Sequence, residues 1–169
     1  MKHLKSLLIA AVLFLSATTL STAQSKVAHV NATELVSSMP ETKQAETELE
    51  ALGKTYEKDY QAMVTEYQNK LKQYEKDATT QTAEVNSKRV TEVRTMEQKL
   101  QQFQQTSGQE LQKKQGELLK PITEKAKAAI LKVAKSQGFQ YVLDSTQGAG
   151  VIMAEGKDLL KDVQKELGF

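Results

Sequence analysis

The feature that most constrains this chain is an eleven-residue repeat in its central part. Apolar and aromatic residues between Leu49 and Ala78 recur at successive spacings of three, four and four. One such cycle gives about 3.67 residues per turn, close to the α-helical period, so the apolar stripe runs almost straight along a helix. The sequence therefore predicts one long helix here and a second helix that covers its stripe. The repeat consists of Leu49, Leu52, Tyr56, Tyr60, Met63, Tyr67, Leu71, Tyr74 and Ala78.

A weaker form of the same repeat predicts the second helix. Residues 79–82, Thr-Thr-Gln-Thr, are β-branched and polar residues that interrupt the apolar stripe. We therefore expect two antiparallel helices over residues 41–120, a hairpin whose tip lies near residues 79–82. The second stripe has one row of Val85, Met96, Ser107 and Leu118 and another of Leu100, Leu111 and Ile122.

Pairing the helices about that tip brings one glycine opposite another. Gly53 then faces Gly108, and each glycine costs a helix about 1 kcal/mol relative to alanine, so this level is a predicted flexing point. A chance coincidence of two glycines is the alternative. Pro121 is a third candidate, because it cannot donate to the carbonyl of Glu117, and we expect the second helix to kink or to be redirected there.

The first residues have the pattern of a signal peptide. Basic Lys2 and Lys5 precede an apolar run over residues 7–15, and small residues follow up to Ala23. A membrane-spanning helix needs roughly 20 apolar residues, about twice this run. We expect residues 1–23 to direct export of the chain from the cytoplasm and to be removed by cleavage between Ala23 and Gln24.

The start of the exported chain predicts a strand and a short helix. Residues 26–30 are mostly apolar, and Asn31 suits the N-cap of a helix over residues 32–37. Asn31 also begins an Asn-Ala-Thr glycosylation sequon, but the cap is the favoured explanation. These residues form the first part of a predicted body, 24–40.

Residues 121–169 predict the rest of that body. A helix ends at Gly138, which suits the residue after a helix C-terminus. A strand at 139–143 and a second strand at 151–153, joined through a Gly-rich turn, then form a predicted β-hairpin. A C-terminal amphipathic helix completes the body.

Three short strands from one chain leave open edges and little core. We therefore expect several copies to share one body while their helical hairpins project from it. A monomeric hairpin with a sheet cap is the alternative. The candidate residues for the shared body are Val27, Val30, Phe139, Tyr141, Val142, Leu143, Val151 and Ile152.

Catalytic, metal and cofactor sites are not predicted. The chain has no Cys and two His, His3 and His29, which excludes thiol chemistry and argues against a His-rich metal centre. Residues 148–150 begin like a dinucleotide fingerprint, but Met153 takes the place of its third glycine. We therefore expect neither an enzyme nor a cofactor.

Charge likewise argues against nucleic acid as a partner. Lys2 and Lys5 lie in the signal segment, so the exported chain keeps 21 of its 23 basic residues against 21 acidic ones. A balanced chain has no global basic field to attract nucleic acid.

The aromatic and Met residues of the hairpin have two interpretations. They fill the seam between the helices, which is the commoner role of such a stripe, or their flanks face a cavity, where Met and Tyr suit loose contact with varied partners. The candidate contact residues are Tyr56, Tyr60, Met63, Tyr67, Tyr74, Val93, Met96 and Phe103.

Four stretches together resemble the Skp/OmpH family of periplasmic chaperones, and the likeness covers nearly the whole exported chain. The most specific portion is the Pro-Ile helix followed by the Gly-aromatic strand. The stretches are Val-Ala-His-Val-Asn at 27–31, Met-Pro-Glu at 39–41, Leu-Leu-Lys-Pro-Ile at 118–122 and Gly-Phe-Gln-Tyr-Val-Leu-Asp at 138–144.

The resemblance implies a jellyfish-like homotrimer in which three chains build a β-rich body and their helical hairpins, the tentacles, surround a cavity. It further implies ATP-independent holding of unfolded outer-membrane proteins in the periplasm, which prevents their aggregation. Because the exported chain is balanced in charge, we expect contact with the membrane or lipopolysaccharide to be weak at most. An exported coiled-coil scaffold protein of the cell envelope is the alternative function.

Overall fold

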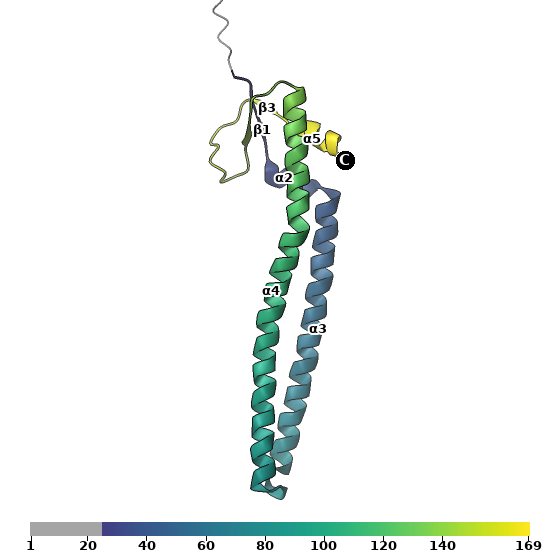
Figure 1. Cartoon of the computed structure of the whole chain (residues 1–169), viewed down its shortest axis with the longest axis vertical. Helices are drawn as coiled ribbons and strands as arrows, with labels where there is room; N and C mark the ends of the chain where they lie inside the picture. The colour runs from purple at the N-terminus through teal and green to yellow at the C-terminus, as the bar shows by residue number, and fades with distance from the viewer. Residues whose placement is uncertain (1–24) are drawn as a thin grey trace, which may run out of the picture.

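In the computed structural model, residues 25–169 are described, and they form a small body and a long two-helix projection (Figure 1). We call residues 40–120 the stalk and the remaining described residues the body. The predicted signal peptide and the cleavage site between Ala23 and Gln24 lie outside the described residues. The prediction of a mostly helical chain with a small β part is confirmed.

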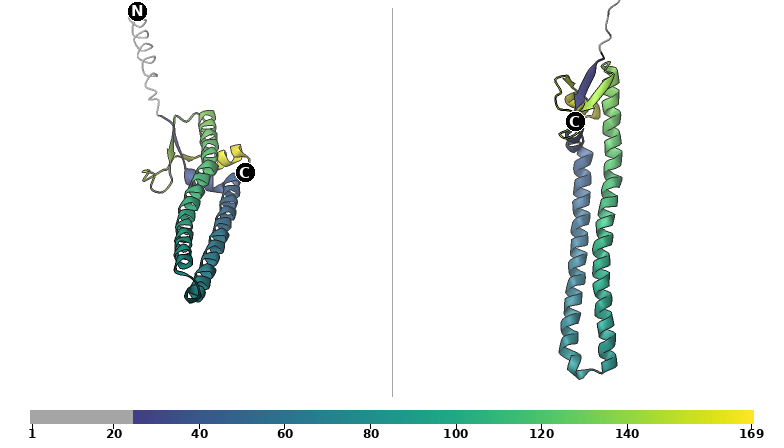
Figure 2. Two further views of the ribbon diagram at one scale, coloured as in Figure 1. Left: turned by 60° about the horizontal axis from the view of Figure 1, so that its bottom comes forward. Right: turned by 90° about the vertical axis from the view of Figure 1, so that its left-hand side faces the viewer.

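The stalk consists of two long helices that run side by side in opposite directions (Figure 2). Helix α3 covers Pro40–Asp77, and at 1.5 Å per residue it is about 57 Å long. The 3-10 turn η1, Ala78–Thr80, leads to α4, Ala83–Ser136. The Thr82 side chain accepts a hydrogen bond from the Val85 backbone nitrogen at 3.3 Å, which caps the start of α4.

Helix α4 belongs to both parts, because it continues through Pro121 into the body. Of the two outcomes expected at Pro121, redirection of the chain is therefore wrong, while a kink within the continuous helix stays a prediction. The proline ring lies on an exposed side of the helix, while the next residue, Ile122, is buried against the body. Burial of Ile122 keeps α4 helical past the hydrogen bond that Pro121 cannot donate. Figure 1 shows a gentle change of direction in α4.

The body contains a parallel sheet of three short strands in the order β2-β1-β3. Strand β1, Val27–Val30, pairs with β2, Tyr141–Asp144, so that Val27 lies beside Tyr141. Strand β3, Lys157–Asp158, pairs with the other side of β1.

The predicted β-hairpin is wrong. Residues 151–153 are not in a strand, and the third strand is Lys157–Asp158, which runs parallel to β1. The apolar, β-branched sequence of 151–153 favours a strand, but within one chain this segment has no strand to pair with.

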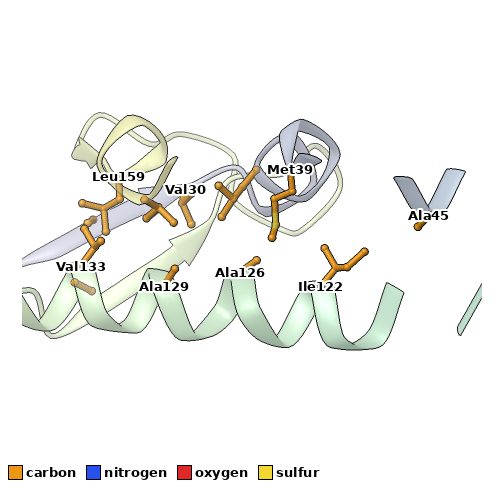
Figure 3. Packing of buried hydrophobic residues seen from close by; sticks show 12 residues of the cluster. Val30, Met39, Ala45, Ile122, Ala126, Ala129, Val133 and Leu159 are labelled. Carbon is orange, nitrogen blue, oxygen red and sulfur yellow. The ribbon is translucent and has the colours of Figure 1, made fainter. Parts of the chain in front are cut away.

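The core lies where α4 meets the sheet and two short helices, α2, Ala32–Ser38, and α5, Leu160–Leu167 (Figure 3). Helix α4 presents several small residues there, which let α5 and α2 approach closely. The fully buried side chains come from α2, from α5 and from the residues just before α3 and α5; they are Leu35, Val163, Met39 and Leu159. The core comprises Ala28, Val30, Leu35, Met39, Ala45, Ile122, Ala126, Ala129, Val133, Ala134, Leu159 and Val163.

Two predicted helix ends are confirmed. The Asn31 side chain accepts a hydrogen bond from the Glu34 backbone nitrogen at 3.0 Å and caps α2. Gly138 has φ of 73°, and the Phe139 backbone nitrogen donates to the Ala134 carbonyl at 2.9 Å. This is the Schellman arrangement that ends α4 and turns the chain into β2.

Candidate functional site

The seam of the stalk is held by tyrosines of α3 that donate hydrogen bonds to glutamates of α4. Each tyrosine ring lies half-buried between the helices while its hydroxyl reaches a carboxylate at the edge of the seam. The pattern recurs from the middle of the stalk to its tip, so the seam is amphipathic and not a dry apolar core. The pairs are Tyr56–Glu110 at 2.5 Å, Tyr67–Glu97 at 2.6 Å and Tyr74–Glu92 at 2.5 Å.

An aromatic cluster lies at the middle of the stalk. Phe103 of α4 meets Tyr56 edge-on, with ring centroids 6.1 Å apart, and stacks on Tyr60 at 6.5 Å. Both arrangements are favourable geometries for aromatic pairs. One step closer to the tip, Met63 of α3 and Met96 of α4 line a small cavity of about 90 Å³.

Charged groups concentrate near the tip around Tyr74. Lys70 pairs with Glu92, and the Arg89 guanidinium lies 4.6 Å from the centre of the Tyr74 ring. The pKa of the Glu92 carboxyl lies below its usual value, mainly because Lys70 donates a hydrogen bond to it and secondly because Tyr74 does. The hydrogen bond to Glu92 in turn raises the pKa of Tyr74. These groups keep Glu92 ionised and tie the two helices together.

Beside this cluster, the two helices form an open groove of about 480 Å³ near the tip. Its floor is apolar and includes Leu71 and Val93, and Val90 is 53% exposed. Arg89 and Arg94 stand among its lining residues. The groove offers an open, mostly apolar surface with charged side chains among its lining.

All eight predicted contact residues of the stalk are half-buried in this structure, and the contacts described above place them at the seam. Of the two interpretations, seam packing accounts for these contacts within one chain. Sequence reasoning missed the glutamate partners on α4 and the exposed Val90. The glutamates could have been found, because Glu97 and Glu110 accompany the second, weaker stripe at helical spacing.

The two glycines of the predicted flexing point occupy open positions. A Cβ atom added at Gly53 or at Gly108 meets nothing within 4 Å. Close approach of the helices therefore does not require glycine at either position, and the flexing point stays a prediction.

The sheet separates the predicted body residues into two sets. Val30 is 2% exposed, and it packs with Val142 and Phe139 against the single-chain core. On the opposite face, Val27 lies beside Tyr141, and both are exposed, as is Leu143. We call Val27, Tyr141 and Leu143 the outer sheet face. Val151 is half-buried, and Ile152 lies fully exposed in the loop that follows β2.

Residues 25–169 contain neither a cluster of metal ligands nor a helix that could span a membrane. Within this range, no group of three or more His, Cys, Asp or Glu side chains is placed to hold a metal ion. Nor does any described helix combine the length and apolar character needed to cross a membrane.

Comparison with known proteins identifies similar sequences. A family model described as outer membrane protein (OmpH-like) matches residues 26–167, which include both the body and the stalk. The curated "Chaperone protein Skp" of Pectobacterium atrosepticum is 27% identical over 155 residues, which cover 92% of this chain and 93% of that protein.

Proposed function

The chain belongs to the OmpH-like outer membrane protein family, and we propose that it is an ATP-independent holding chaperone for unfolded outer-membrane proteins in the periplasm. The observation that carries this proposal is the family match over residues 26–167, a range that includes both body and stalk. The relative named as a chaperone aligns over nearly its whole length and supports the same role. The chain needs no catalytic residue or cofactor for it.

In this proposal, the working unit is a homotrimer built through the bodies. The outer sheet face supports such an assembly, because Tyr141 is 60% exposed and Val27 and Leu143 are each more than 40% exposed in one chain. Burying these side chains between copies contributes about 25 cal/mol for each Å² of apolar surface removed from water. Three stalks then project from one shared body and surround a cavity.

Clients are held by many weak contacts along the stalks. A half-buried tyrosine or methionine at the seam exposes only its flank, so each contact contributes a fraction of the roughly 1.5–3 kcal/mol of full side-chain burial. The client stays unfolded and avoids the entropic cost of ordering. Because no single contact is strong, release requires no nucleotide.

The test is an aggregation assay. An outer-membrane barrel protein is diluted from denaturant into buffer with physiological salt, with and without an equimolar amount of the assembled chain, and light scattering is followed. We expect suppression of scattering. Unchanged scattering would remove the chaperone proposal, and filaments of the chain itself would favour the envelope scaffold.

A further inference from the structure

The sulfur atoms of residues 25–169 all belong to methionines, because the chain contains no cysteine. The four methionines differ in their access to solvent. Met39 is fully buried in the body, whereas Met153 is 73% exposed in the loop after β2. Met63 of α3 and Met96 of α4 are half-buried at the seam of the stalk. The chain thus carries thioethers at three depths, and two of them meet at one cavity.

The cavity that Met63 and Met96 share has a volume of about 90 Å³. One water molecule needs only about 10–15 Å³ of such space, so a molecule of a few atoms fits beside the two thioethers. Glu66 and Lys99, both exposed, also line the cavity, and Leu100 completes it. Because charged side chains stand among the lining, water enters the cavity, and a small polar solute can enter with it.

The two methionines lie between two directional contacts of the seam, where α3 and α4 run side by side (Figure 2). On the side of the body, the Tyr60 ring belongs to the aromatic cluster. On the side of the tip, the Tyr67 hydroxyl donates to Glu97. A thioether is only a weak hydrogen-bond acceptor, so the methionines contribute to the seam through apolar burial. A reaction that makes their sulfur atoms polar therefore acts directly on the contact between the helices.

We propose that Met63 and Met96 form a paired oxidation site, at which a peroxide converts both thioethers to sulfoxides and loosens the middle of the stalk. In each reaction, a lone pair of the sulfur attacks one oxygen of hydrogen peroxide. The S–O bond forms as the O–O bond breaks, and the leaving hydroxide takes the proton of the transferred oxygen and departs as water. The sulfur loses two electrons, and the peroxide gains them.

Exposure decides which methionines react and which reactions matter. Oxidation of methionine converts a flexible apolar side chain into a polar one and disrupts the interfaces that it fills. Met39 has no contact with solvent, so a peroxide does not reach it. Met153 is open, and its sulfoxide stays in water without disturbing the fold. Met63 and Met96 combine partial access with a place between two helices, so their oxidation is coupled to the structure.

A sulfoxide oxygen at the seam needs hydrogen bonds, and water that enters to supply them separates the helices. This regulation rests on the proposed function, because the seam is the surface proposed to hold clients. Polar sulfoxides offer clients less apolar surface, so oxidation lowers the holding activity. Methionine sulfoxide reductases reverse the change. Two thiols of the reductant become a disulfide, the oxygen leaves as water, and the thioether returns.

The first measurement maps the oxidation. The exported protein is treated with hydrogen peroxide, samples are digested at intervals, and the sulfoxide at each methionine is quantified by mass spectrometry. We expect Met153 to react first and Met63 and Met96 to react several-fold faster than Met39. In concentrated urea, all four rates should become similar. Rates at Met63 and Met96 no higher than the rate at Met39 in the folded protein would overturn the site.

The second measurement is the melting temperature before and after treatment, followed by circular dichroism. The oxidised protein should melt at a lower temperature. Met63→Leu combined with Met96→Leu keeps an apolar seam, since Leu and Met have similar volumes, and this double variant should melt at the same temperature before and after peroxide. Met153→Leu is the matched control and should remain sensitive. An equal loss in the double variant, or no loss in the original chain, would overturn the loosening.

The aggregation assay then connects the site to holding. We expect the oxidised protein to suppress scattering several-fold less than the untreated protein, and methionine sulfoxide reductases should restore the suppression. Unchanged suppression after complete oxidation of Met63 and Met96 would overturn the regulation alone. If the untreated protein gives no suppression, the proposed function fails, while the sulfoxide map and the melting temperatures still decide whether the oxidation site exists.

Discussion

The hydroxyl of Tyr67 on α3 donates a hydrogen bond of 2.6 Å to the carboxylate of Glu97 on α4. Apolar contacts have little directional preference and tolerate sliding, whereas a hydrogen bond requires particular atoms to meet. The same kind of bond recurs toward each end of the stalk. These bonds therefore set which residues of the two helices lie at the same level.

Removing one of these hydroxyls should loosen the stalk without changing its shape. Tyr67→Phe keeps the ring in the seam but leaves Glu97 to be solvated, so we expect a lower melting temperature, measured by circular dichroism. Tyr60→Phe is the matched control, because the Tyr60 ring stacks on Phe103 and its hydroxyl has no partner within residues 25–169. Equal effects of the two changes would contradict a role for the hydrogen bond.

The structure predicts a loss of stability in acid. The pKa of Glu92 is lowered by its hydrogen bonds from Lys70 and Tyr74, below the ordinary value of 4.5. The carboxylate therefore contributes its full stabilisation above pH 4.5, and this contribution is lost as the pH falls through the lowered pKa. Denaturant unfolding between pH 7 and pH 3 measures it.

Glu92→Gln should lower stability at pH 7 and flatten this pH dependence. Glu57→Gln, an exposed position on the same stalk, serves as its control and should leave the curve unchanged. A curve of Glu92→Gln parallel to that of the original chain would show that another group carries the acid sensitivity.

The stability of the body should depend far more on its buried leucines than on its exposed ones. Leu35 is fully buried, so Leu35→Ala should cost about 2–5 kcal/mol of unfolding free energy in urea. Leu131→Ala, at a position 48% exposed, should cost much less in a single chain. If the two substitutions lower the free energy of unfolding of the assembled protein by the same amount, Leu131 is buried there by a second copy.

Substitution of Gly138 should destabilise the chain, and its backbone conformation is the sole reason. An added Cβ there meets nothing within 4 Å, but φ of 73° is unfavourable for other residues. Gly138→Ala should therefore destabilise the chain by about 1–2 kcal/mol. Gly116 lies inside α4 with equally open space, and Gly116→Ala should instead stabilise the helix by up to about 1 kcal/mol. Thermal unfolding of both variants measures the difference, and stabilisation by Gly138→Ala would contradict this account.

Replacing Gly53 and Gly108 together with alanine tests the predicted flexing point. Alanine fits at both positions, so the double variant folds with a more stable stalk. If the glycines make this level flexible, the distribution of distances between spin labels at the tip and in the body should narrow. An unchanged distribution would show that the two glycines are a coincidence.

Local sequence signals predicted most of the secondary structure. The eleven-residue repeat predicted the stalk helices, since helix periodicity needs only neighbours along the chain. Asn31 and Gly138 predicted the start of α2 and the end of α4, because each acts through backbone groups within one turn. The same reasoning found the segments of β1 and β2, but it could not find the order or direction of the strands.

Contacts between distant residues decided the rest. Lys157–Asp158 forms the third strand because the chain returns beside Ala28 and His29, not because its own residues favour a strand. Ile152, which has the better strand sequence, is left without a partner in one chain. Pro121 did not end the helix, since burial of Ile122 and Ala126 holds it together.

The sequence by itself thus determined where the helices run and where they stop, because a helix satisfies its hydrogen bonds locally. Only the tertiary structure decided which strands pair, which tyrosine meets which glutamate and which face of the sheet stays open. Those choices depend on groups far apart in the chain, and their free energy exists only once the folded backbone brings them together.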